Sequence, residues 1–195
     1  MNKSTRSIIS LKFFIVAAFL FFAFANGGLI VKTLAQTKNQ PTDCTRATPT
    51  RIVKKSVFPK TTFKLSGDRR TGTETVKFPN GDRLIITNGG CEYYYLGFRF
   101  ETRRFSARTA NTKYWFAQAV KLIAEIEKGI NAQSIQIPDA VRALKKHIKK
   151  TPQPKVGEEI DYGGTDIRTF VAIKKIKRLA KGRFALELYF AVGPL

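Results

Sequence analysis

An Asn-Gly pair at positions 80–81 constrains the fold of this chain more than any other feature. It stands between two runs that alternate polar and apolar residues, Thr73–Phe78 and Arg83–Thr87. Such alternation is typical of half-buried strands, and Asn-Gly between two of them is the strongest short-range signal for a hairpin. The sequence therefore predicts two antiparallel strands joined by a tight turn, with Leu84 and Ile86 on one face.

The hairpin is predicted to be part of a larger antiparallel meander. Residues 88–90, Asn-Gly-Gly, favour a second turn, and Cys91–Thr102 is expected to form a long third strand. Upstream of the hairpin, Arg51–Phe58 and Thr61–Leu65 have the composition of short strands.

Beyond Ala107 the apolar residues recur at helical spacing, which predicts two helices. The first is expected to begin after Asn111, whose side chain can cap it, and to end at Gly129. The second is expected over about 138–150, with Pro138 in its first turn. The apolar stripes are Trp115, Ala119, Leu122, Ile123 and Ile126 in the first helix, and Val141, Leu144 and Ile148 in the second.

The remaining residues return to strand patterns. Arg168–Arg178 is expected to be a strand, and a turn near 180–182 leads to a final strand, 183–192, that alternates cleanly. Clean alternation indicates one buried face and one wet face. We therefore expect an α+β domain: an antiparallel sheet of about six or seven strands, meander first, with two helices packed on one face.

The N-terminus predicts export from the cytoplasm. Three basic residues and no acidic residue occur in the first dozen positions, and an unbroken apolar run, Phe13–Ala25, follows them. This order is typical of a signal peptide. Cleavage is expected before Gln36, after the small-residue site Thr33-Leu34-Ala35, with an earlier site before Asn26 as the alternative.

An uncleaved membrane anchor is the other interpretation of this segment. Residues 13–31 are just long enough to span a bilayer, but the polar and glycine residues at 26–28 weaken that span. We divide the chain into a signal peptide (1–35), an extended N-terminal arm (36–50) and a single α+β domain (51–195). The expected location is periplasmic or secreted.

The charge of the chain is strongly positive, at +21. Four of the 35 basic residues and none of the 14 acidic residues precede Gln36, so the mature chain would carry +17. A field of this sign attracts anionic polymers and anionic membrane surfaces. The alternative is a basic protein without a special partner. No specific nucleic-acid target is indicated, and a protein partner stays open.

The two cysteines, Cys44 and Cys91, are expected to form a disulfide, because an exported protein usually oxidises such a pair. The sequence has no C-x-x-C motif, and its one histidine, His147, is distant from both cysteines and expected on the surface. A redox role, a metal site and a cofactor therefore have little support.

The third predicted strand holds the first candidate site. Period-two geometry places Tyr93, Tyr95, Arg99 and Glu101 on the face away from the core, with Gly97 between them. Tyrosines stack on sugar or base rings, Arg99 suits a carboxylate or phosphate, and Gly97 lets a ligand approach. The alternative is a solvent-facing strand with cross-strand tyrosine pairs and an Arg99–Glu101 contact.

The second predicted helix holds the other candidate site, for anions. Its basic residues lie mostly away from the apolar stripe, an arrangement that suits an anionic membrane surface or polyanion. The alternative is a solvated face whose late lysines favour the negative end of the helix. The basic residues are Arg142, Lys145, Lys146, Lys149 and Lys150.

These features favour an exported, non-enzymatic binding module with a basic surface. Two alternatives stay open. One is a hydrolase of envelope polymers that uses the acids at Glu158, Glu159, Asp161 and Asp166. The other is a structural accessory that contacts protein partners through the wet face of the sheet.

Overall fold

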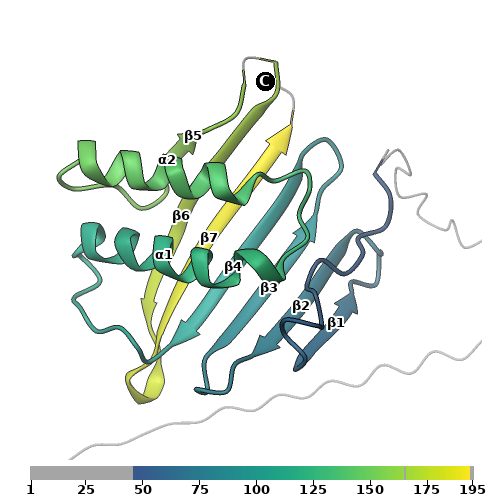
Figure 1. Ribbon diagram of the computed structural model, residues 1–195, viewed down its shortest axis with the longest axis horizontal. Coiled ribbons are helices and arrows are strands. Elements are labelled where there is room, and N and C mark those ends of the chain that lie inside the picture. Colours follow the sequence, from purple (N-terminus) through teal and green to yellow (C-terminus); the bar gives the residue numbers. More distant parts are fainter. Residues whose placement is uncertain (1–45, 165, 194–195) are drawn as a thin grey trace, which may run out of the picture. The chain divides into compact units, whose positions relative to one another are not determined.

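The computed structural model describes residues 46–164 and 166–193 (Figure 1). These residues form a seven-stranded sheet, two α-helices and two short 3₁₀ helices. The elements in chain order are β1 (Thr61–Leu65), β2 (Thr71–Lys77), β3 (Arg83–Gly89), β4 (Tyr94–Thr102), α1 (Thr112–Ile126), η1 (Glu127–Gly129), α2 (Ile137–Lys150), β5 (Glu159–Asp161), β6 (Arg168–Arg178), η2 (Ala180–Gly182) and β7 (Phe184–Gly193).

The sheet is antiparallel throughout and has the strand order β1-β2-β3-β4-β7-β6-β5. It consists of two meanders, one before the helices and one after them, which meet where β4 pairs with β7. The expected fold class, an α+β domain with a meander first, is therefore confirmed.

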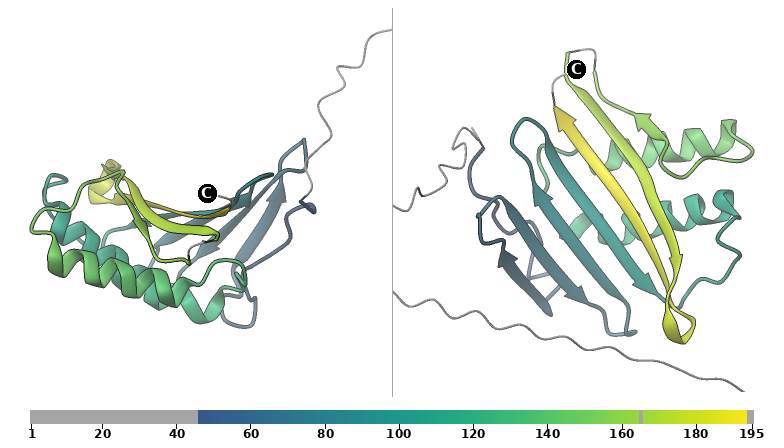
Figure 2. Two further views of the ribbon diagram at one scale, coloured as in Figure 1. Left: turned by 90° about the horizontal axis from the view of Figure 1, so that it is seen from above. Right: turned by 180° about the vertical axis from the view of Figure 1, so that it is seen from behind.

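Both helices cover the same face of the sheet, as the views from above and behind show (Figure 2). The core lies between the two layers, where aromatic rings of α1 and the sheet meet. The Trp115 and Phe184 rings are 4.8 Å apart, and Phe98 and Phe190 pack edge to face at 5.2 Å. The apolar stripe predicted for α1 is buried, as are Val141 and Leu144 of α2, whereas Ile148 is only partly buried.

The local signals for helix ends and turns act largely as predicted. The Asn111 side chain accepts a hydrogen bond from the Tyr114 N–H at 3.2 Å and caps α1. The helix ends at Ile126, but η1 carries the turn on to Gly129. Pro138 lies in the first turn of α2, and Gly81 takes a positive φ of 83° in the β2–β3 turn.

The prediction of a strand over Arg51–Phe58 is wrong. Val53 forms a single isolated bridge with Ile130, and the chain turns immediately afterwards. The physical reason is that a buried carboxylate replaces a partner strand: Glu74 Oε1 accepts hydrogen bonds from the N–H groups of Ile52 and Val53 at 2.6 and 3.2 Å. The three-residue strand β5 was not predicted.

Several expectations fall on residues outside the described ranges. The signal peptide, its cleavage before Gln36, most of the arm (36–50) and Cys44 belong to this group, and they stay predictions. Within the described ranges, no helix is both long enough and apolar enough to cross a membrane.

Candidate functional site

The basic residues of α2 are all exposed on the outer side of the helix. Its apolar residues Ile137, Ala140, Val141 and Leu144 are buried against the core, and its basic residues lie on the opposite, solvent-facing side. We call the exposed set the α2 basic face. It consists of Arg142, Lys145, Lys146, Lys149 and Lys150.

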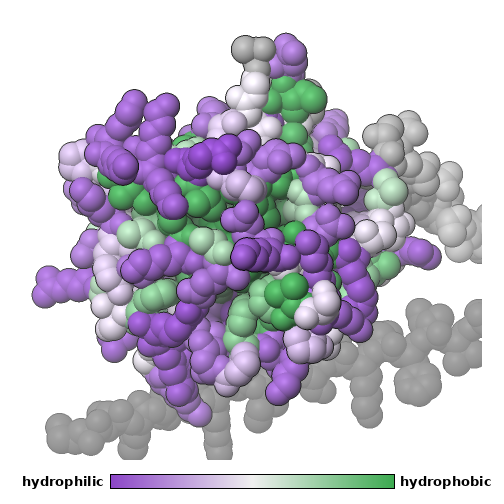
Figure 3. Space-filling model, viewed as in Figure 1, coloured by the Kyte–Doolittle hydropathy of each residue, from purple (hydrophilic) through white to green (hydrophobic). Residues whose placement is uncertain are grey.

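The α2 basic face is a surface of largely uncompensated charge. Its five side chains line a shallow depression of about 310 Å³ (Figure 3 shows hydrophilic side chains over α2). Arg142 forms an ion pair with Asp139 one turn earlier. In the part of the chain that the structure describes, no carboxylate lies within 4 Å of the four lysines.

His147 lies on the same helix but not on this face. Its side chain is 15% exposed and packs against the Phe116 ring at 6.1 Å, so it is more buried than expected. Its Nε2 atom is 3.4 Å from Glu158 Oε2 but makes no hydrogen bond. His147 therefore connects α2 to α1 and to the loop before β5.

The candidate residues of β4 are only partly brought together. Tyr95, Arg99 and Glu101 share the outer face of the sheet, the face away from the helices. Tyr93 precedes β4, and its ring lies over Gly193, where a Cβ atom would come within 2.1 Å of it. Gly193 and Tyr189 share one face of β7, so Tyr93 lies on the same outer face as Tyr95 and Arg99, but beyond the start of β4.

Arg99 and Glu101 belong to a network of ion pairs that spans three strands. Arg99 Nε lies 2.9 Å from Glu101 Oε1, and Arg99 Nη1 lies 2.6 Å from Glu187 Oε1 on β7. Arg83 of β3 and Arg183 approach Glu101 Oε2 at 2.7 and 3.4 Å. We call these five residues the Glu101 network.

Glu101 is the centre of this network, and its side chain is only 5% exposed. Burial raises the pKa of its carboxyl, but the hydrogen bonds and charges of Arg99 and Arg83 outweigh burial and hold the pKa below its usual value. The carboxylate therefore stays ionised and surrounded by guanidinium groups.

Tyr95 and Gly97 have neighbours of their own. The Tyr95 ring stacks on Tyr189 of β7 with centroids 5.6 Å apart. A Cβ atom on Gly97 would lie 2.5 Å from the Thr87 hydroxyl, so the space above Gly97 is filled by Thr87 rather than left open for a ligand. The tyrosine pair and the Arg99–Glu101 contact are those that the solvent-facing alternative predicts.

A depression of about 300 Å³ nevertheless remains beside this row. It is bordered by Arg99, Lys174, Glu187 and Tyr189. Burial raises the pKa of the Tyr189 phenol, with further contributions from Tyr95 and Glu159. The outer-face row of Tyr95, Arg99 and Glu101 is therefore a candidate surface whose charged members are already paired with each other or with Glu187.

Two of the acids around β5, Glu159 and Asp161, are also paired with basic side chains. Arg168 bonds Glu159 and Asp161, each at 2.9 Å, and Lys174 contacts Glu159 at 3.3 Å. No group of three or more His, Cys, Asp or Glu side chains in the described ranges has the arrangement of a metal site. β5 pairs only with residues 170–172 of β6, so the second half of β6 is an edge of the sheet. The lysines and the arginine at 174–178 discourage another strand from pairing there.

The described start of the chain lies beside Cys91. Arg46 Nε donates a hydrogen bond to the Cys91 carbonyl at 3.1 Å. Cys44 is two residues earlier in the sequence but outside the described ranges. The Cys44–Cys91 bridge therefore stays a prediction, which free-thiol labelling of the unreduced protein tests.

Searches for related proteins supply no further assignment, since no protein-family model, curated protein or solved structure matches the chain.

Proposed function

We propose that this domain is an exported, non-enzymatic binding module, and that the α2 basic face contacts an anionic polymer or an anionic membrane surface. The observation that carries the proposal is the exposed row of four lysines without a carboxylate neighbour among the described residues. Uncompensated charges on a solvent-facing surface attract polyanions, and the net charge of +17 expected for the mature chain adds to this field.

The packing of α2 favours contact by charge over insertion into a membrane. An interfacial helix must place its apolar side in the lipid. The apolar side of α2 is already used in the core, where Ile137, Val141 and Leu144 are buried. The lysines then act at the surface of the partner, and binding depends on the density of its negative charge.

Salt dependence tests this function. Each phosphate or similar group that a lysine neutralises releases a counterion, so affinity for a polyanion falls steeply as salt rises. The binding of soluble polyphosphate, and of vesicles rich in an anionic phospholipid, is measured over a salt series. The triple variant Lys145→Gln, Lys146→Gln, Lys149→Gln should weaken binding and reduce the log–log salt slope by about one per lysine engaged.

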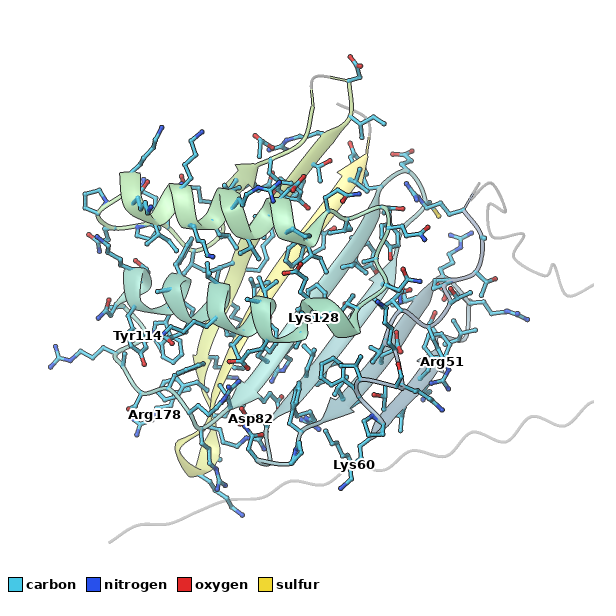
Figure 4. All side chains as sticks on the ribbon, viewed as in Figure 1. Arg51, Lys60, Asp82, Tyr114, Lys128 and Arg178 are labelled. Atoms are coloured by element: carbon cyan, nitrogen blue, oxygen red, sulfur yellow. The ribbon has the colours of Figure 1, made fainter. Side chains whose placement is uncertain are left out.

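A matched control removes the same charge from a distant surface. Lys60, Lys64 and Lys77 lie in or beside β1 and β2, are exposed, and are replaced together by Gln (Lys60 is labelled in Figure 4). This variant should keep the salt slope of the native protein. An equal loss of binding in both triple variants would show that only net charge matters. Equal binding by the native protein and both variants would overturn the proposal.

Export itself is tested separately. N-terminal sequencing of the exported protein should begin at Gln36. A chain that retains Met1 in the membrane fraction would favour the anchor instead.

A further inference from the structure

A second, separate basic site lies where the N-terminal arm faces the loop before α2. A pocket of about 530 Å³ is bordered by residues 46–52, the end of β3, Tyr94 and the loop 131–134. This volume is in the range of small-molecule sites. We call it the arm pocket. Among the described residues that line it there are two arginines and no acid.

The walls of the arm pocket are held by hydrogen bonds within the protein. The Glu74 carboxylate accepts from the Ile52 N–H at 2.6 Å, and the Asn131 N–H donates to the Ile52 carbonyl at 2.7 Å. The buried Asn88 amide donates to the Thr50 carbonyl at 3.3 Å. The arm is thereby fixed between the sheet and the loop, so a ligand meets a largely preformed site.

The close packing of Pro49 against Gly72 of β2 also holds the arm between the sheet and the loop. A Cβ atom on Gly72 would lie 3.2 Å from Pro49 Cβ and 3.0 Å from Asn88 Oδ1. The arm therefore lies directly on the inner face of β2, and a side chain at position 72 would displace it.

The two arginines are held by aromatic rings instead of carboxylates. The Arg46 guanidinium lies over the Tyr94 ring at 5.6 Å, and the Arg51 guanidinium lies over Phe63 at 5.2 Å (Arg51 is labelled in Figure 4). Neither arginine has a carboxylate within 4 Å among the described residues. Cation–π contact orients a guanidinium while leaving its charge unneutralised. Both groups therefore remain able to pair with an anion.

We propose that the arm pocket binds a small acidic sugar, a sugar ring that carries a carboxylate or a phosphate group. Arginine recognises both oxyanions through paired N–H donors. The amides of Asn131 and Gln133 and the hydroxyl of Ser134 line the same pocket and suit ring hydroxyls. This ligand is a small molecule, and its site shares no residue with the α2 basic face.

Calorimetric titration of the full chain with four probes tests the ligand class. Glucuronate carries the carboxylate, glucose 6-phosphate carries the phosphate, glucose lacks a charge, and inorganic phosphate lacks the ring. At least one acidic sugar should bind about tenfold or more tightly than glucose and than inorganic phosphate. Only an acidic sugar offers an oxyanion to the arginines and ring hydroxyls to the amides. Preference between the two acidic sugars identifies the oxyanion.

Variants then locate the binding. Arg51→Gln should weaken binding of the preferred sugar about tenfold or more, as expected when a charge-assisted hydrogen bond is lost. Arg103→Gln removes the same charge just beyond the far end of β4, at an exposed residue, and should change affinity less than about twofold. Arg46→Gln serves as the second pocket variant if Arg51→Gln does not fold. The α2 triple variant should keep sugar binding while losing polyanion binding.

A measurement on the native protein avoids dependence on variants. The side-chain amide signals of Asn88 and Asn131 should shift on addition of the preferred sugar in a nuclear magnetic resonance titration. Three results would overturn the proposal: no acidic sugar binds, glucose binds as tightly as both acidic sugars, or Arg103→Gln weakens binding as much as Arg51→Gln.

Discussion

The α2 basic face and the Glu101 network both concentrate basic side chains, yet they differ in what surrounds them. On α2, only Arg142 of the five basic residues has a carboxylate partner among the described residues, namely Asp139. On the outer face of the sheet, Arg83, Arg99 and Arg183 converge on one buried carboxylate. The charges of the α2 basic face point into solvent, whereas the arginines of the Glu101 network are paired with a carboxylate of the protein itself.

The difference shows that availability for binding depends on tertiary partners more than on local composition. Arg99 meets Glu187 across 88 residues of sequence, and Arg183 meets Glu101 across 82. The lysines of α2 have no such distant partner among the described residues. A basic cluster is therefore a candidate site for external anions only if the fold leaves it without carboxylate partners from the protein itself.

Removal of the central carboxylate should have the largest effect on stability. Glu101→Gln leaves three arginines around a neutral side chain, and we expect a loss of about 3 kcal/mol in the free energy of unfolding. This lies at the low end for breaking a buried ion pair, because the arginines are partly exposed. Urea unfolding measures the loss. Glu125→Gln, at an exposed pair with Arg104, should cost less than about 1 kcal/mol, and equal losses would contradict the comparison.

The Glu101 carboxylate should also make the free energy of unfolding depend on pH. The pKa of Glu101 is lowered in the folded protein, so its contribution is fully present above the unfolded value near 4.5. It is lost as the pH falls from there through the lower folded pKa. Urea unfolding at a series of pH values below 5 should show this loss in the native protein. The curve of Glu101→Gln should lack the loss of stability that protonation of Glu101 causes. Parallel curves for both proteins would contradict the lowered pKa of Glu101.

A smaller effect is expected at Gly97, which separates Tyr95 from Arg99. Gly97→Ala places a methyl group 2.5 Å from the Thr87 hydroxyl and should cost about 2 kcal/mol, typical of overpacking. Combining it with Thr87→Ala should restore most of the loss in urea unfolding. Failure of this rescue would show that Gly97 is needed for a reason other than Thr87.

The smallest effect on stability is expected on α2. The lysines at 145, 146 and 149 are exposed and lack ion pairs among the described residues, so their joint replacement by Gln should change the free energy of unfolding by less than about 1 kcal/mol. Urea unfolding of the triple variant checks this. A loss as large as that of Glu101→Gln would show that these charges are structural and that the two surfaces do not differ in kind.

Local patterns were sufficient to predict most of the fold. Alternation identified β7, helical spacing identified α1 and α2, and Asn111 identified the start of α1. Prediction failed where a residue is satisfied by a distant side chain, as when Glu74 takes the N–H groups of Ile52 and Val53. The strand β5 is too short to produce a detectable alternation.

The candidate sites divide in the same way. The five basic residues of α2 lie together because helix periodicity, which a sequence reveals, places them there. The partners of Arg99 on β7 and the arm pocket around Arg51 depend on strand order and on the path of the arm. Two arginines in a Thr- and Pro-rich stretch were the only signal for that pocket, and they do not indicate a common site.

The pairing of β4 with β7 also has a consequence for how the chain folds. Each meander can form from neighbouring residues, but the seven-stranded sheet is complete only when β7 of the second meander pairs with β4 of the first. Contacts between such distant segments form slowly, because a long loop must be closed before they stabilise the structure. Until then β4 and β7 are both unprotected edges. The period before β7 docks is therefore when this protein is most exposed to aggregation.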